Sequence, residues 1–255
     1  MRQILIPTDF SANALNATKY ALELFKYEKV NVYFLHTYQD EVYQDIELLS
    51  NKDFEKLVDE KSKQSQDNLD ALLKQVKKEY PNPRHNYSVI PAYNTLIDEI
   101  DLIVEGKNID IIVMGTKGET NDKKLIFGSH TLQVLKYVSC PVLSIPSGYK
   151  YTPPKQVVFP TNYMIPYKRR ELKLLCEMVS PFRANIDLLY VSSIQKLSHR
   201  QEDNRLFLEE ELYKNTLGFK TVNNKNISEA IFSYAKENGT ELLVMVNTRH
   251  SFLED

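Results

Sequence analysis

Residues 109–129 read IDIIVMGTKGETNDKKLIFGS, and this stretch decides the fold. Its first six residues, apolar and mostly β-branched apart from Asp110, are of the kind that makes a buried strand. Gly115, Gly118 and Gly128 follow within fourteen residues, although the whole chain of 255 residues contains only seven glycines. A chain that otherwise avoids glycine has placed it where the backbone must turn sharply or approach something closely. Helical spacing resumes over residues 125–137, so the stretch predicts a strand, a glycine-rich loop and a helix.

The same alternation extends through the first half of the chain. Apolar runs predict strands at residues 3–6, 30–36, 87–90, 109–114 and 141–145. Helical spacing predicts helices at residues 13–27, 51–80, 95–107 and 125–137, the first of them N-capped by Ser11. Nearly continuous apolar strands separated by helices are typical of a parallel sheet covered on both faces. We therefore expect an open α/β sandwich.

The second half repeats the first. QILIPTDF at residues 3–10 recurs as QVVFPTNY at residues 156–163, and NVYFLHT at residues 31–37 recurs as NIDLLYV at residues 185–191. Two tandem copies explain the length better than one large domain does. We expect domains at residues 1–147 and 155–255, joined by a linker rich in turn-forming residues. Too little chain follows the second copy's fourth strand to form a last helix and strand, so this copy is expected to be truncated.

Composition excludes several classes of protein. Hydrophobic residues make up 42% and charged residues 26%, and the formal net charge is −2, which argues against a general binder of nucleic acid or anionic membranes. No apolar run approaches the ~18–20 residues of a membrane span, and the N-terminus has no signal-peptide pattern. Two cysteines are too few for a disulfide framework. We expect a cytoplasmic globular protein.

The glycine-rich loop is the candidate site. In doubly wound sheets, ligands bind outside the carboxyl ends of the strands, where the strand order reverses. Gly115 and Gly118 would let the loop turn and present backbone N–H groups, and Gly128-Ser129 lies near the start of the helical segment, where free N–H groups and the helix dipole favour a phosphate. Several charge-assisted hydrogen bonds of ~1.5–3 kcal/mol each would be needed for micromolar binding.

The spacing of these residues resembles that of a known family. Gly115-x2-Gly118-x9-Gly128-Ser129, with Pro7-Thr8-Asp9 after the first strand and Cys140-Pro141-Val142 before the fifth, resembles the ATP-binding subgroup of the universal stress protein family, whose pattern is G-x2-G-x9-G-[ST]. The resemblance covers essentially all of the first domain. It implies a Rossmann-like fold of five parallel strands with ATP, with or without Mg²⁺, laid across the switch point.

The resemblance also implies a set of contacts. Asp9 would contact the adenosine beside a wall shaped by Pro7 and Thr8, and Thr37 would lie at the adenine. The residues that would surround the ribose and phosphates are Met114, Gly115, Gly118, Gly128, Ser129 and His130. The family usually has a small aliphatic residue where Thr37 and His130 stand.

The second copy departs from this pattern. Asn162 replaces the acid, and Val246-Asn247-Thr248-Arg249 replaces the glycine loop. Side chains at these positions keep a backbone from approaching a phosphate closely. We expect one nucleotide site per chain, in the first domain.

Structural roles compete with these assignments. Glycines after a strand can be plain turn residues, and Asp9 is as well suited to cap the following helix as to contact a ligand. His36 at a strand end and His130 on a helix are more often structural than catalytic, and the five histidines show no metal-binding spacing.

Three functions follow from these patterns. The first is an ATP-binding regulatory protein of the stress response. The second is a slow ATP hydrolase or adenylyl-transfer enzyme on the same scaffold, which the lack of a Walker A lysine, a nucleophile elbow, and HIGH or SGGxDS signatures disfavours. The third is a dimerising interaction scaffold with a vestigial pocket.

Association is a separate expectation. Members of the family pair through their fifth strands, and the truncated second copy has none to offer. Residues 142–145 would then be an exposed edge, which proteins rarely leave unprotected. We expect a homodimer through the Val142–Ile145 edge of the first domain, or a natural chain longer than this sequence.

Overall fold

The computed structural model describes residues 1–46, 54–116, 128–164, 167–193 and 196–246. Contacts divide the chain into two units, Met1–Tyr151 and Thr152–Asp255. The boundary falls inside the expected linker. The first part of the linker belongs to the first unit because it packs against that unit. Asn16 donates to the carbonyl of Tyr149 at 3.0 Å, and the Tyr151 ring lies 5.2 Å from that of Tyr20.

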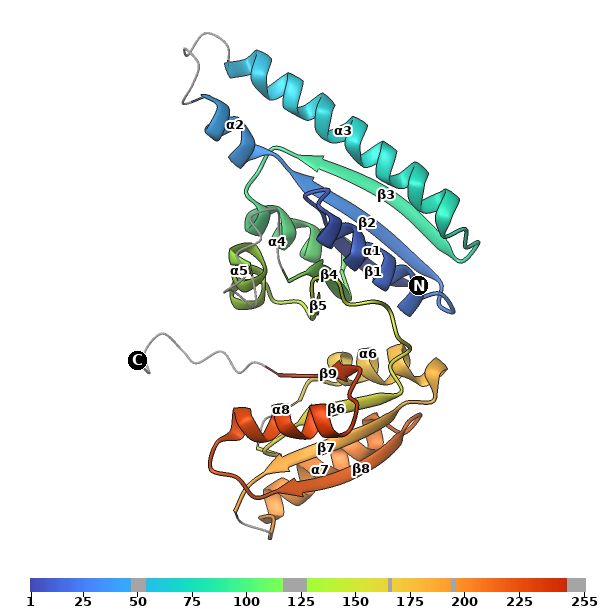
Figure 1. The fold of residues 1–255 in the computed structure, drawn as a ribbon, viewed down its shortest axis with the longest axis vertical. Helices are drawn as coiled ribbons and strands as arrows, with labels where there is room; N and C mark the ends of the chain where they lie inside the picture. Colours follow the sequence, from blue (N-terminus) through green and yellow to red (C-terminus); the bar gives the residue numbers. More distant parts are fainter. Residues whose placement is uncertain (47–53, 117–127, 165–166, 194–195, 247–255) are drawn as a thin grey trace. The chain divides into compact units, whose positions relative to one another are not determined.

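The first unit is a parallel five-stranded sheet with helices on both faces (Figure 1). Its strands are β1 (Arg2–Pro7), β2 (Val30–Thr37), β3 (His85–Ala92), β4 (Ile111–Gly115) and β5 (Val142–Ile145). Its helices are α1 (Ala12–Leu24), α2 (Gln39–Ile46), α3 (Phe54–Glu79), α4 (Leu96–Lys107) and α5 (Ser129–Tyr137). The sheet order is β3-β2-β1-β4-β5, so the expected α/β fold is confirmed. Helix α2 is the element that the sequence patterns missed.

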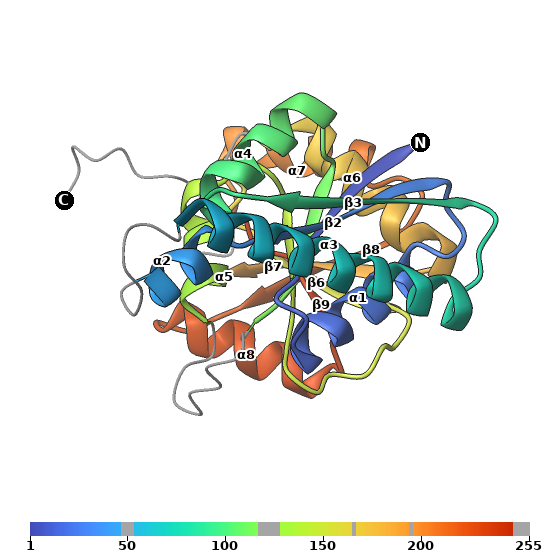
Figure 2. The same ribbon diagram turned by 90° about the horizontal axis from the view of Figure 1, so that it is seen from above.

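Alternation of side chains along the strands explains why both faces are covered. Leu5, Ile112 and Met114 point into a buried cluster with residues of α4 and α5. Because successive side chains point to opposite faces, Ile4 and Val113 face the other side, and they are buried as well. That second face lies under α1 and α3, which contact the sheet (Figure 2).

The second unit contains a parallel sheet of four strands in the order β8-β7-β6-β9. Its elements are β6 (Gln156–Pro160), α6 (Arg169–Val179), β7 (Asn185–Val191), α7 (His199–Glu211), β8 (Thr216–Val222), α8 (Ile227–Glu237) and β9 (Leu242–Leu243), with a 3₁₀ turn at Ser180–Phe182. Within the described residues this order matches that of the first sheet without a counterpart of β5.

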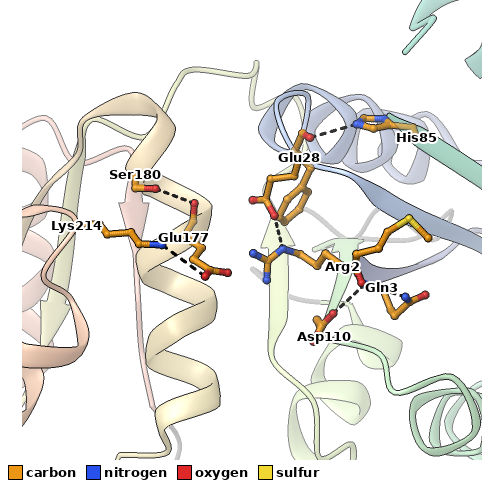
Figure 3. A network of polar contacts seen from close by, with 10 residues as sticks. Arg2, Gln3, Glu28, His85, Asp110, Glu177, Ser180 and Lys214 are labelled. Atoms are coloured by element: carbon orange, nitrogen blue, oxygen red, sulfur yellow. Dashed lines mark hydrogen bonds and ion pairs between the residues drawn. The ribbon is translucent and has the colours of Figure 1, made fainter. Parts of the chain in front are cut away.

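The amino ends of the two sheets are held by corresponding contacts. In the first unit the N–H of Gln3 donates to Asp110 at 2.8 Å (Figure 3), and in the second the N–H of Gln156 donates to Glu241 at 2.6 Å. In each case the acid lies directly before the strand that pairs with the one carrying the glutamine. A side-chain carboxylate thus satisfies a backbone donor at the same place in both sheets.

The turns at the opposite ends of β1 and β6 also correspond. Phe10 and Tyr163 both adopt left-handed backbone, with φ of 60° and 56°. Each donates its N–H to the hydroxyl of the threonine two residues earlier, Thr8 at 3.0 Å and Thr161 at 2.9 Å. A non-glycine residue in this region is uncommon, so the shared conformation marks a turn whose surroundings determine it.

Candidate functional site

The carboxyl ends of β1 and β4 form the switch point of the first sheet. The two strands are neighbours, and the chain leaves them in opposite directions, toward β2 from one and toward β5 from the other. The crevice outside such a pair of strand ends is where ligands bind in open α/β sheets. Nine of the ten residues singled out in the sequence lie at this edge: Pro7, Thr8, Asp9, Thr37, Met114, Gly115, Gly128, Ser129 and His130. Gly118 lies outside the described residues.

The turn after β1 leaves the Asp9 carboxylate exposed. One carboxylate oxygen of Asp9 accepts the N–H of Ser11 at 3.0 Å, an Asx turn that orders the connection. The hydroxyl of Ser11 accepts the N–H of Ala14 at 3.1 Å and caps α1. Ser11 is therefore the cap, as predicted, and Asp9 is not. The side chain of Asp9 faces solvent with acceptor capacity to spare.

Gly115, at the end of β4, has a packing role that the sequence patterns did not predict. A Cβ atom at Gly115 would lie 3.1 Å from the carbonyl oxygen of Asn13 and 3.3 Å from its carbonyl carbon. The backbone of Gly115 is not left-handed. Glycine suits this position because α1 begins against the end of β4, where an added Cβ would require Asn13 to shift by a few tenths of an ångström, rather than because the loop turns at this residue.

Hydrogen bonds join the two ends of the connection from β4 to α5. The N–H of Gly128 donates to the carbonyl of Thr116, whose own N–H donates to Ile145 at 2.9 Å. The buried hydroxyl of Thr131 donates to the carbonyl of Gly115 at 2.9 Å. These bonds hold the start of α5 beside the end of β4.

Helix α5 begins with groups suited to an anion. Gly128 is its N-cap, with φ −69° and ψ 159°, and has no side chain to occupy the free N–H groups of the first turn. Ser129 and His130 follow and are exposed. The N-terminus of a helix presents N–H donors and the positive end of the helix dipole to an anion.

The remaining predicted residues form the walls of this edge rather than its exposed surface. Met114 is buried in the cluster beneath α4 and α5, and Pro7 is buried at the end of β1. Thr8 is buried, and its hydroxyl is engaged with the N–H of Phe10. Thr37 is half-buried at the end of β2, paired with Ala92 of β3.

A polar cluster behind the β1–α1 turn was missed by the sequence analysis. His36 of β2 is 7% exposed, and its ring centroid lies 4.6 Å from that of Phe10. Its Nδ1 lies 2.8 Å from the hydroxyl of Ser65 in α3, and its Nε2 lies 3.2 Å from Glu41 in α2. One signal was present in the sequence: Ser65 stands in the apolar stripe of α3, between Val58 and Leu69, where a polar residue needs a partner.

These three residue types also occur in hydrolytic triads, but the geometry excludes that chemistry. Ser65 is only 1% exposed, so no substrate carbonyl can reach its hydroxyl. A nucleophile must lie within reach of both a base and a substrate. The cluster of His36, Ser65 and Glu41 is therefore a structural support.

A surface hollow of about 250 Å³ lies between the β1–α1 turn and α3. Its lining includes Thr8, Phe10, Leu15, and residues of α3 between Asn68 and Gln75. Asp9, Gly115 and Gly128 are not among the lining residues. The hollow shares Thr8 with the candidate site and otherwise lies on the α3 side of the β1–α1 turn.

No helix in the described part of the chain is long and apolar enough to cross a membrane. Among the same residues, no three His, Cys, Asp or Glu side chains lie together so that they could hold a metal ion.

Comparisons with known proteins single out one family. A model of the universal stress protein family matches residues 1–146. Universal stress protein MJ0577 of Methanocaldococcus jannaschii is 28% identical over 152 residues, covering 56% of this chain and 94% of the relative. Universal stress protein MJ0531 of the same organism is 31% identical over 146 residues, covering 56% and 81%.

Solved structures extend the likeness to both units, as one example shows. The crystal structure of a universal stress protein from Archaeoglobus fulgidus covers 95% of this chain and 84% of its own, with a TM-score of 0.63 and 18% identity. At that identity the likeness shows the fold alone. The family model matches residues of the first unit, and the fold match extends into the second.

Proposed function

The chain belongs to the universal stress protein family, and on that premise we propose that its first unit is an ATP-binding regulatory module of the stress response. The observation that carries the proposal is the pairing of two features at one switch point. The exposed Asp9 carboxylate lies at the end of β1, and the N-terminus of α5, which has no side-chain capping bond, lies at the end of the neighbouring strand β4. A nucleoside triphosphate needs a hydroxyl acceptor at one end and anion donors at the other.

Each residue has a proposed role. The free acceptor capacity of Asp9 suits a hydroxyl or amino group of adenosine, and Thr37 would border the adenine. Phosphate oxygens would accept from the first-turn N–H groups of α5 and from the hydroxyl of Ser129, with Gly118 and His130 completing the set. Pro7, Thr8, Met114 and Gly115 would shape the floor, because they are buried or pack against α1. Any Mg²⁺ would be held chiefly by the phosphates, as is usual for this ion.

We propose that the second unit is a degenerate copy without a nucleotide site. Its turn after β6 is already occupied by the protein's own side chains. Gln201 of α7 donates to the carbonyl of Asn162 at 2.9 Å, and Asn204 donates to the carbonyl of Tyr163 at 2.6 Å. Asn162 also supplies a neutral amide where Asp9 supplies a carboxylate.

Direct binding tests the proposal. We expect calorimetry to give one ATP per chain with a Kd in the micromolar range, about 8 kcal/mol of binding free energy. Denatured protein should release an adenine nucleotide that mass spectrometry identifies. A turnover assay with and without Mg²⁺ separates a binding module from a slow hydrolase. Failure of the full chain to bind any adenine nucleotide would contradict the proposal and favour an interaction scaffold.

We further propose a homodimer through β5. This strand is at one end of the first sheet's order, and exposed Leu132 and Tyr137 lie on the neighbouring α5. An unprotected edge next to apolar side chains favours pairing with a second copy. Sedimentation at micromolar concentration should give twice the mass of one chain, and a Leu143→Lys variant should shift the equilibrium toward monomer. A single-chain mass for the unmodified protein at that concentration would overturn this proposal.

A further inference from the structure

The conformation of the β1–α1 turn depends on a contact from outside it. Phe10 holds a left-handed backbone, which costs a residue with a side chain about 1 kcal/mol or more. Such a conformation persists only where the surroundings enforce it. The ring of His36 lies against the ring of Phe10, at 4.6 Å between centroids and 46° between planes. Asp9 directly precedes Phe10, so whatever holds Phe10 also sets the direction of the Asp9 carboxylate.

Hydrogen bonds determine the orientation and tautomer of His36. A carboxylate only accepts, so Nε2 of His36 carries the proton donated toward Glu41 at 3.2 Å. In the neutral ring Nδ1 is then an acceptor, and the hydroxyl of Ser65 donates to it at 2.8 Å. Lys61 of α3 lies 3.6 Å from Glu41 and 2.8 Å from Asp45, which fixes Glu41 in turn. The ring is thus held from α2 and from α3.

The second unit repeats this layout with different chemistry. Tyr190, at the position in β7 that matches His36 in β2, lies with its ring 5.7 Å from that of Tyr163. Gln201 of α7 donates to the hydroxyl of Tyr190 at 3.3 Å, as Ser65 of α3 does to His36. An aromatic ring held by a helix supports the left-handed residue in both units. The contact therefore accompanies this type of turn in both units, and it does not depend on the residue being histidine.

We propose that His36 is a positioning residue of the nucleotide site: it holds the Asp9–Phe10 turn in the conformation that presents the Asp9 carboxylate, and Ser65 and Glu41 hold His36. The inference rests on the proposed function of that site. His36 itself touches no ligand in this scheme. His36 acts on the affinity for ATP through Phe10. It does not change the N–H groups at the start of α5 that would bind the phosphates.

A dependence on pH follows from the two hydrogen bonds. The charged groups that face His36 are Asp9 in the turn, Glu41 in α2 and Lys61 in α3, with Asp45 paired to Lys61. Burial lowers the pKa of His36 below its ordinary value of about 6.5 despite the opposing pull of Glu41. The ring is therefore neutral at pH 7. Protonation at acid pH turns Nδ1 into a donor, so the hydrogen bond with the Ser65 hydroxyl must reverse. It also places a charge on a ring that burial favours as neutral, so support of the turn weakens as the pH falls.

The test compares two buried histidines in the full chain. His85 of β3 is, like His36, 7% exposed, has a pKa lowered by burial, and bonds to the carbonyl of Phe25, but it lies at the amino end of the strands. We expect His36→Gln to raise the Kd for ATP about tenfold at pH 7 and Ser65→Ala about threefold. His85→Gln should lower thermal stability and leave the Kd within about twofold.

Two further measurements distinguish the loss of this local positioning from a general loss of protein stability. Between pH 7 and 5.5 the affinity of the wild type should fall more steeply than that of His36→Gln, because both proteins share all other titrating groups. Hydrogen exchange at the backbone amides of Phe10 and Ser11 should accelerate in His36→Gln and not in His85→Gln. If the wild type binds no ATP, both proposals fall. If it binds and His36→Gln matches it in affinity and pH profile, or His85→Gln weakens binding equally, only the positioning role is overturned.

Discussion

A Gly128→Val variant should bind ATP at least about a hundredfold more weakly than the wild type while unfolding at nearly the same temperature. Gly128 has φ −69° and ψ 159°, a conformation that valine adopts without strain. The added side chain would stand over the first-turn N–H groups of α5. Losing two charge-assisted hydrogen bonds at ~1.5–3 kcal/mol each accounts for the effect on binding. Calorimetric titration and thermal unfolding measure the two expected results.

Lys168→Val is a matched control for that variant. Lys168 is the N-cap of α6 in the second unit, with similar extended backbone and likewise no side-chain capping bond. Its contact with Glu171 is an exposed ion pair of little energetic weight. We expect Lys168→Val to leave the Kd for ATP unchanged. Full affinity in Gly128→Val would show that phosphate does not bind at the start of α5. We also expect Gly118→Val to abolish binding, on the family's glycine spacing alone.

Gly218→Ala should lower the free energy of unfolding of the second unit by about 3 kcal/mol. A Cβ atom at Gly218 in β8 would overlap the carboxylate of Asp187 in β7. Asp187 is 2% exposed and accepts from Gln156 at 2.7 Å, Asn185 at 3.1 Å and Tyr234 at 2.9 Å. Displacing this carboxylate breaks bonds that compensate a buried charge.

The state of Tyr234 supports the same expectation. Burial, followed by its hydrogen bond to Asp187, raises the pKa of Tyr234 to about 12, so its hydroxyl is a donor at neutral pH. Chemical denaturation followed by circular dichroism measures the loss of stability. Gly106→Ala is the control, because a Cβ there meets nothing within 4 Å and alanine stabilises a helix by ~0.5–1 kcal/mol over glycine. Equal stability of Gly218→Ala and the wild type would mean that β8 yields to the added atom.

The sequence predicted most elements of the first unit because their hydrophobic period and capping residues agree with the structure that they form. The apolar runs at residues 109–114 and 30–36 became β4 and β2 within a residue or two, and Ser11 caps α1 as expected. Helix α2 was missed because Gln39–Ile46 is short and mostly polar, and among its residues 39–45 only Val42 is fully buried. A single buried position gives no helical period to read.

The location of the candidate site was predictable for a similar reason. Carboxyl ends of parallel strands meet at one edge, so residues following β1 and β4 had to lie together once the topology was known. The role of Gly115 was not predictable, because it depends on how closely α1 begins to the end of β4. The support of Phe10 by His36 was also hidden, since the two residues lie 26 positions apart and belong to different elements.

By itself the sequence determined the class of fold, the repeated pattern of its two halves and the glycine-rich loop, because hydrophobic period, internal similarity and residue type are properties of the chain. Only the tertiary structure decided which side chains contact the β1–α1 turn, how closely α1 approaches Gly115, and that α7 donates to the corresponding turn of the second unit. Those outcomes depend on distances between elements remote in sequence. Such distances are settled by packing, which no local pattern encodes.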